Sequence, residues 1–208
     1  MALSPNEELL LFSTDHNQII SVKINLEKPT DEAMPFDYLI TSFHSKYING
    51  LDTCIKKPMI ATCSFDRTVR LWGFESRSHH CSLKIVQTIN EEPLTLAFHP
   101  SGYHILVATP EHVKMMNVLD NKIETYHEVG IKNCRVLAFS NSGHYFACAQ
   151  GTSVFVYKFY TAWTPPEFHF RGHFGPVIQI TWFEDDTGFA TCGQDNLIMT
   201  HYLFSNKK

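Results

Sequence analysis

Short apolar runs alternate with small polar turns along almost the whole chain. In five places, two runs of β-type residues are separated by a turn rich in Pro, Gly, Asn or Asp, which is typical of a β-hairpin. These segments are residues 2–13, 51–64, 96–109, 137–150 and 180–193. No long helical pattern competes with them, so the sequence predicts an all-β fold.

A further apolar run follows each hairpin after a second turn, at residues 19–24, 69–74, 113–119, 154–159 and 197–204. The equivalent residues in these second turns are Asp15, Asp66, Pro110, Gly151 and Asp195. After a longer first interval the turns recur every ~40–45 residues, which is the period of four-stranded β-propeller blades. The longer interval holds a Pro-bearing acidic stretch at residues 26–37, which we interpret as a loop insertion.

The period predicts one propeller segment that covers residues 1–208 and contains about five units. The expected units are residues 1–25, 38–76, 84–120, 123–160 and 168–204.

Composition supports a globular chain and weakens two classes of partner. Of the 208 residues, 44% are hydrophobic and 18% are charged, which is typical of a folded domain with a core. The formal net charge is −4, and the 17 basic residues are dispersed, so we expect neither a nucleic acid nor an anionic membrane as partner. No apolar run approaches the ~18 residues that span a bilayer. We expect a soluble, intracellular protein.

The six cysteines form no C-x-x-C pair. Four of them lie inside apolar runs, namely Cys54, Cys63, Cys148 and Cys192. Buried free thiols in a reducing compartment are the simplest interpretation of this pattern.

The sequence gives little support for a metal or phosphate site. The segment 79–81 (His-His-Cys) offers three adjacent ligands in a Ser/Arg-rich connector, without the paired spacings of a zinc site, so we expect a solvated loop. His99 and His144 lie beside Ser-Gly turns, and we expect them at the surface or as caps of those turns. The acidic residues 184–186 fall in a hairpin turn, where such residues are common. Glycine-rich phosphate loops are absent, so the sequence predicts neither metal nor cofactor.

Two units contain a more specific pattern. Residues 60–72 read IATCSFDRTVRLW, and residues 171–177 read RGHFGPV, followed by ATCGQD at residues 190–195. Gly-His at the start of a unit and Asp before its last strand resemble the landmarks of WD repeats, so the resemblance implies WD40-type blades.

In WD repeats a His, a Ser or Thr, an Asp and a Trp form a hydrogen-bonded tetrad inside one blade. The resemblance implies that the second unit uses His44, Thr62, Asp66 and Trp72. In the fifth unit it implies His173, Thr191 and Asp195, with Tyr202 or His201 where Trp would stand. A buried carboxylate can only accept hydrogen bonds, so it needs an imidazole N–H and backbone donors around it.

The same residue types also occur in a hydrolase triad, which would make this an enzyme. The Ser and Thr residues, however, lie within strands, and no G-x-S-x-G sequence exposes a nucleophile. We therefore expect structural tetrads and no catalysis.

Partner contacts are expected at the loops of the blades. In WD families the residue before the tetrad Asp often faces one end of the propeller, and here these positions hold Phe65 and Gln194. An exposed Phe65 would be an interaction candidate, although packing of Phe65 on the adjacent blade is an equal alternative. The segment 163–166 (Trp-Thr-Pro-Pro) is interpreted as an extended connector.

A narrower resemblance comes from the amino-acid sequences of five segments, residues 3–8, 13–18, 58–67, 96–102 and 139–144. Together they are similar to the second propeller of the cilia- and flagella-associated protein 57 family. The resemblance implies a scaffold of the ciliary or flagellar axoneme, within cytoplasm and cytoskeleton, linked to assembly and regulation of inner dynein arms. The implied partners are the inner dynein arm, the nexin–dynein regulatory complex and related WD-repeat proteins.

Two other function classes stay open. One is a general cytoplasmic WD-repeat adaptor, such as a substrate-recognition subunit. The other is a hydrolase built on a propeller, which requires a cluster of carboxylates or a nucleophile–base pair that the sequence does not show.

The chain departs from that family in length. Family members have two propellers and then a coiled coil, whereas this chain shows about five units and no heptad segment. Five units do not complete the seven-bladed ring that the resemblance implies, and an open ring leaves strand edges unpaired. We therefore expect a fragment, a truncated gene model, or an isoform whose ring another polypeptide completes.

Overall fold

A computed structural model describes residues 2–3, 9–13, 19–23, 36–38, 43–75, 80–120, 122–161 and 165–204. All regular elements within these ranges are β-strands, which confirms the predicted all-β class. The chain divides into two compact units, Met1–Tyr47 and Ile48–Lys208, and each is described by itself. None of the described residues belongs to a helix that could cross a bilayer.

The first unit contains one antiparallel sheet in the order β1-β2-β3-β4. Its strands are β1 (Ala2–Leu3), β2 (Leu9–Ser13), β3 (Ile19–Lys23) and β4 (Phe36–Tyr38). Each strand pairs with the next one along the chain, so the sheet is a meander like a propeller blade.

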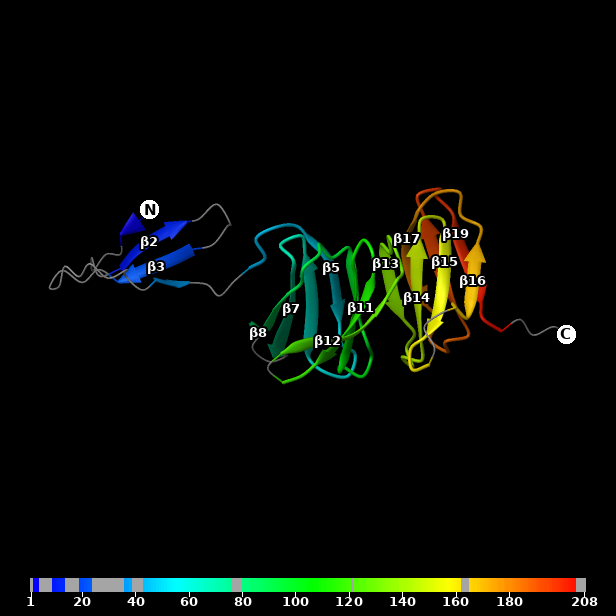
Figure 1. Ribbon diagram of the computed structural model, residues 1–208, viewed down its shortest axis with the longest axis horizontal. Coiled ribbons are helices and arrows are strands. Elements are labelled where there is room, and N and C mark those ends of the chain that lie inside the picture. Colours follow the sequence, from blue (N-terminus) through cyan, green and yellow to red (C-terminus); the bar gives the residue numbers. More distant parts are fainter. Residues whose placement is uncertain are drawn as a thin grey trace. The chain divides into compact units, whose positions relative to one another are not determined.

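The second unit contains four antiparallel sheets that follow one another in chain order, from cyan to red in Figure 1. The first sheet consists of β5 (Ile48–Thr53), β6 (Met59–Ser64), β7 (Thr68–Glu75) and β8 (His80–Thr88). The second consists of β9 (Thr95–Phe98), β10 (His104–Ala108), β11 (Val113–Val118) and β12 (Ile123–Val129). The third consists of β13 (Val136–Phe139), β14 (Tyr145–Gln150), β15 (Ser153–Lys158) and β16 (Phe168–Arg171). The fourth has three strands among the described residues, β17 (Val177–Trp182), β18 (Gly188–Gly193) and β19 (Ile198–Tyr202).

We call these four sheets blades B, C, D and E. Three apolar clusters join them, and each cluster takes residues from neighbouring blades. In blade B the face of Ala61, Cys63 and Val69 is fully buried against blade C. In blade D the strands alternate, with Phe146 and Cys148 packed toward blade C and Ala147 and Ala149 toward blade E. This period of two explains why the strands are apolar on both faces.

The predicted sequence units are offset from the sheets by one strand. β8 begins at His80, and the unit predicted for residues 84–120 starts inside this strand. In the same way, β12 opens the unit 123–160 and β16 opens the unit 168–204, although both strands pair with the preceding sheet. Each repeat therefore supplies the outer strand of one blade and the inner strands of the next, which ties neighbouring blades together.

The Ser-Gly turns form as their residue types predict. Gly102 and Gly143 have positive φ values of 77° and 78°, in the left-handed region that glycine adopts at no steric cost. The Gly102 N–H donates to the His99 carbonyl at 2.9 Å, and the Gly143 N–H donates to the Ser140 carbonyl at 2.9 Å. These turns join the first two strands of blades C and D.

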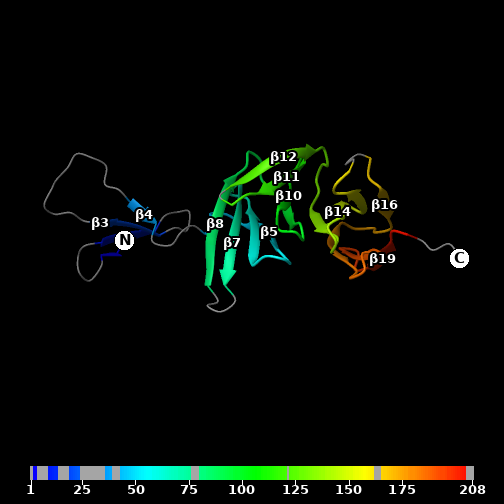
Figure 2. The ribbon, with the colours of Figure 1, turned by 90° about the horizontal axis from the view of Figure 1, so that it is seen from below.

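The blades of the second unit follow one another from β5 to β19 in Figure 2. Their first strands contact one another, and polar side chains bridge the blades there. Asp52 of blade B accepts a hydrogen bond from the Phe98 N–H of blade C at 2.7 Å. Trp182 of blade E donates from Nε1 to the Ala138 carbonyl of blade D at 3.1 Å. Burial raises the pKa of Asp52, and the N–H groups of Phe98 and Thr53 oppose this rise.

The described cysteines are free thiols, as the sequence predicts, and four of the five are buried. Cys192 is half-buried and not fully enclosed as its apolar run suggested, because it does not belong to the apolar cluster that blade E forms with blade D. The thiols of Cys134 and Cys148 lie next to each other, with sulfur atoms 2.7 Å apart.

Candidate functional site

Blade E holds a chain of hydrogen bonds that we call the His173 network, formed by His173, Thr191, Asp195 and His201. His173 Nδ1 lies 2.9 Å from Asp195 Oδ2, and His173 Nε2 lies 2.8 Å from Thr191 Oγ1. Thr191 Oγ1 lies 3.2 Å from His201 Nε2. Of the two residues considered for the position of Trp, the structure places His201 in the network and leaves Tyr202 60% exposed.

The carboxylate of Asp195 organises the turn between β18 and β19. It can only accept hydrogen bonds, so His173 Nδ1 carries the proton between them. The same carboxylate accepts the N–H groups of Phe174 at 2.9 Å and Leu197 at 3.1 Å. Burial alone would raise the pKa of Asp195, but the hydrogen bonds from His173, Leu197 and Phe174 lower this pKa to about 2. Asp195 therefore stays ionised and holds the loop before β17 to the turn before β19.

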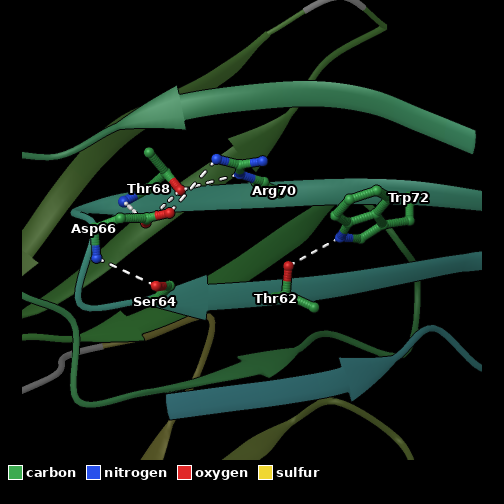
Figure 3. Close-up of polar contacts among 6 residues, drawn as sticks. All are labelled: Thr62, Ser64, Asp66, Thr68, Arg70 and Trp72. Atoms are coloured by element: carbon green, nitrogen blue, oxygen red, sulfur yellow. Dashed lines mark hydrogen bonds and ion pairs between the residues drawn. The ribbon is translucent and has the colours of Figure 1, made fainter. Parts of the chain in front are cut away.

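Blade B contains a different arrangement at the equivalent place (Figure 3). Trp72 Nε1 donates to Thr62 Oγ1 at 2.9 Å, so the structure brings these two predicted residues together. Asp66 Oδ1 accepts hydrogen bonds from the Thr68 N–H at 3.0 Å and the Thr68 hydroxyl at 2.6 Å. The Asp66 N–H in turn donates to Ser64 Oγ at 3.2 Å.

Arg70 is part of this blade B network, and the sequence analysis did not single it out. Its guanidinium lies 3.5 Å from Asp66 Oδ2, and its Nε donates to Thr68 Oγ1 at 3.2 Å (Figure 3). Burial lowers the pKa of Arg70, and the charge of Asp66 opposes that effect. A signal was present in the sequence, because Thr68, Arg70 and Trp72 occupy alternate positions and so share one strand face with Thr62.

His44 belongs to the first compact unit, whereas its expected partner Asp66 belongs to the second. The pairing of His44 with Asp66 stays a prediction. Phe65 is half-buried in the turn between β6 and β7, and Gln194 is exposed in the turn between β18 and β19. The connector residues 162–164 lie outside the described residues.

Blade C holds a third polar group, centred on Lys114, which is only 8% exposed. Its ammonium lies 3.3 Å from Glu91 Oε1 and 3.2 Å from Glu128 Oε1. Burial acts to lower the pKa of Lys114, but the hydrogen bonds and charges of Glu128 and Glu91 raise it overall. A paired cation of this kind is stable inside a sheet because it keeps its carboxylate partners.

His99 is buried, with 2% exposure, and this corrects the expectation that it lies at the surface. Its Nδ1 accepts the Ser101 N–H at 3.1 Å, so it caps its own turn, and its Nε2 reaches the Gly143 carbonyl of blade D at 3.2 Å. Burial lowers the pKa of His99 to about 4. The ring thus stays neutral and joins blade C to blade D, while His144 is exposed as expected.

The described residues offer no obvious reaction chemistry. Within the described ranges, no group of three or more His, Cys, Asp or Glu residues could hold a metal ion. Of the proposed ligand cluster, His79 and the side chains of His80 and Cys81 lie outside what the structure describes. Thr191, the hydroxyl beside His173, is 1% exposed and is already hydrogen-bonded to two histidines. It is therefore closed to a substrate.

A model of the family described as WD domain, G-beta repeat, matches residues 38–73 and 164–199. The first range holds His44, Thr62, Asp66 and Trp72, and the second holds His173, Thr191 and Asp195. The chain therefore contains WD40 repeats. The match and the sheets confirm the predicted class of WD40-type β-propeller blades, with four blades in the second unit and a further sheet in the first.

Relatives of this WD40-repeat protein confirm the narrower resemblance. The chain is 40% identical over 96% of its length to cilia- and flagella-associated protein 57 A of Tetrahymena thermophila, of which it covers 15%. It is 36% identical over its whole length to cilia- and flagella-associated protein 57 of Mus musculus, of which it covers 16%. It is 24% identical over 69% of its length to a 77 kDa echinoderm microtubule-associated protein of Lytechinus variegatus, of which it covers 22%. The chain thus spans a small part of the length of these relatives.

Proposed function

We propose that this WD40-repeat protein is a non-catalytic protein-interaction scaffold of the motile cilium or flagellum. The observation that carries the proposal is the buried state of its His, Asp and Thr groups. In the His173 network the side chains of His173 and Asp195 are only 1% and 7% exposed, and both bond within the blade. Groups whose hydrogen bonds are used inside a sheet stabilise that sheet and leave the loops to contact partners.

The names of the relatives support the location, and the resemblance found in the sequence supports the role. The similarity to proteins named as associated with cilia and flagella supports a place in the axoneme, within cytoplasm and cytoskeleton. On the resemblance found in the sequence, we place the scaffold in assembly of inner dynein arms or regulation of beating. Its proposed partners are the inner dynein arm, the nexin–dynein regulatory complex and related WD-repeat proteins.

Two loop residues are the proposed contacts predicted from the sequence, Phe65 in blade B and Gln194 in blade E. Gln194 is exposed, and its N–H donates to the Pro176 carbonyl at 2.9 Å, which fixes its backbone. A fixed backbone under an exposed polar side chain suits an interface position, because binding then requires little additional ordering.

Tagging the full chain in ciliated cells and imaging it after detergent extraction tests the proposal. We expect the tag to remain on the axoneme and to co-purify with inner dynein arm subunits. Deletion should remove inner-arm density from tomograms and lower beat frequency. A signal that stays diffuse in the cell body and is lost on extraction would instead favour the general cytoplasmic adaptor.

A further inference from the structure

The loop between β16 and β17 presents an aromatic side chain to solvent on a backbone that is held by a hydrogen bond. Phe174 is 89% exposed, the largest exposed fraction of any large hydrophobic residue among those described. Its N–H donates to Asp195 Oδ2 at 2.9 Å, and Asp195 is held in turn by His173. The backbone under this ring is therefore ordered before any partner arrives. Preordered aromatic residues are efficient binding anchors, because little entropy is lost on association.

A cleft of about 430 Å³ lies beside the same loop, where blades D and E meet. It is lined by Asn133, Arg135, Ala149, Gly151, Pro176 and Val177. The Val177 N–H donates to the Gly151 carbonyl at 2.9 Å and so joins the two blades at the cleft. A Cβ atom built on Gly151 would meet nothing within 4 Å, so the space above this turn is open. The size is within the range of cavities that accept a ligand group.

The charge at this cleft is positive. Arg135 is the one charged residue among its described lining residues, and its side chain is exposed. No described residue gives its guanidinium a hydrogen bond or an ion pair, whereas the nearby Lys132 pairs with Glu111 at 2.6 Å. A planar guanidinium binds carboxylates through two parallel hydrogen bonds, so an acidic group is the complementary ligand.

We propose that Phe174, Arg135 and this cleft form a docking site for an acidic segment of a protein partner. An apolar side chain of that segment enters the cleft, a neighbouring carboxylate binds Arg135, and Phe174 packs against the segment. The exposed Gln194, bonded through its backbone to Pro176 of the cleft wall, lies at the rim. The proposal rests on the scaffold function and specifies where in blades D and E the scaffold binds.

Fluorescence anisotropy with three labelled nine-residue peptides tests the site on the full chain. The first peptide has a central leucine between four glutamates on each side, the second replaces leucine with glycine, and the third replaces the glutamates with lysines. We expect the first to bind at least about tenfold more tightly than either of the others, since both the apolar and the acidic contacts contribute. Equal affinity for the glutamate and lysine peptides, or no binding of the first peptide at millimolar concentration, would overturn the proposal.

Variants locate the binding. Arg135→Ala and Phe174→Ala should each lower the affinity for the first peptide by about tenfold or more. Arg135→Lys should give an intermediate loss, because it keeps the positive charge but not the planar guanidinium that makes two parallel hydrogen bonds. Lys84→Ala and Ile55→Ala are matched controls, an exposed cation and an exposed apolar residue of blade B. An unchanged affinity in both Arg135→Ala and Phe174→Ala would reject the site.

Two further readouts complete the test. The side chains of Arg135 and Phe174 are exposed, so their variants should melt at the temperature of the unmodified chain. Amide resonances of residues that line the cleft should shift on titration of the first peptide; shifts confined to other surfaces would contradict the proposal. Binding in solution does not depend on ciliary location, so failure here and failure of the tagging experiment are distinguishable.

Discussion

Thr191 joins the two histidines of blade E through a single hydroxyl group. It lies 2.8 Å from His173 Nε2 and 3.2 Å from His201 Nε2, with 1% of its surface exposed. The hydroxyl can donate to one ring and accept from the other, so both rings have a partner. Both hydrogen bonds therefore depend on the single oxygen Thr191 Oγ1.

Replacing Thr191 with Val removes this hydroxyl while keeping the shape of the side chain. A ring nitrogen of the buried His173 and one of the half-buried His201 lose a partner, so the free energy of unfolding should fall by about 1–3 kcal/mol. Chemical denaturation followed by tryptophan fluorescence measures the change. Thr181→Val is the matched control, because Thr181 lies exposed in the same blade and its loss should change stability little. Equal effects of the two substitutions would remove Thr191 from the network.

His99 gives the second residue-scale prediction, which concerns pH. Burial lowers its pKa to about 4 in the folded chain, from a usual value of 6.5. Between these values the unfolded chain binds more protons, so the contribution of His99 is complete above about pH 6.5 and is lost as the pH falls toward 4. The melting temperature should therefore decrease as the pH is lowered from about 6.5 to about 4. His99→Gln should lower the melting temperature at pH 7 and weaken its pH dependence, whereas His144→Gln should leave both unchanged.

These residues also show what a sequence pattern can indicate. Asp195, Thr191 and His173 were predicted because the resemblance to WD repeats assigns each a place. Of the two alternatives expected for His99, the capping role is found and the surface position is not. Its burial depends on the neighbouring blade, whose Gly143 carbonyl meets its ring. Contacts between blades do not appear in the local pattern.

At the scale of elements, turns of one blade hold turns of the next. Asp186, in the turn between β17 and β18, accepts the N–H groups of Asn141 and Ser142 of blade D, both at 2.7 Å. Its neighbour Asp185 bonds only to Thr187 among the described residues, within its own turn. Adjacent carboxylates therefore serve different purposes, one between blades and one within a blade.

Asp186→Ala should loosen the junction of blades D and E. Asp186 also accepts a hydrogen bond from the Asn141 side-chain amide at 3.1 Å. Loss of these three charge-assisted bonds at a half-exposed site should cost at least about 1 kcal/mol and speed hydrogen exchange at Asn141 and Ser142. Exchange measured by mass spectrometry over the turn peptide checks this. Asp185→Ala should leave exchange at Asn141 and Ser142 unchanged, and a similar increase in both variants would show that the junction does not depend on Asp186.

Strand positions were predictable from sequence, whereas sheet membership was only partly so. The alternation of apolar runs and polar turns places β7, β11 and β15 within one residue of their observed bounds, because period and turn chemistry are local. The same alternation does not reveal which sheet an outer strand joins. β12 and β16 were accordingly assigned to the following unit, although they pair with β11 and β15 of the preceding blade.

At the scale of the molecule, blades B and E share a sequence motif but differ in how far the equivalent residues are buried. The motif Ala-Thr-Cys occurs in β6 and again in β18. In blade B, Cys63 pairs with Val69, and Val69 is fully buried under blade C. In blade E, Cys192 pairs with Ile198 at the equivalent place, and Ile198 is 78% exposed. Blade E therefore exposes an apolar residue at a position whose equivalent in blade B is buried.

Among the described residues β19 pairs only with β18, and an exposed apolar residue such as Ile198 on an edge strand favours self-association. Ile198→Lys should therefore reduce concentration-dependent light scattering of the chain, because a charge on β19 opposes sheet-to-sheet contact. The melting temperature should change little, since Ile198 makes few contacts at 78% exposure. Val69→Lys places the same charge at the equivalent position of blade B, where Val69 is fully buried, and should unfold that blade. If Ile198→Lys destabilised the chain as strongly as Val69→Lys, then the face of blade E would already be covered in solution, and blades B and E would be equivalent.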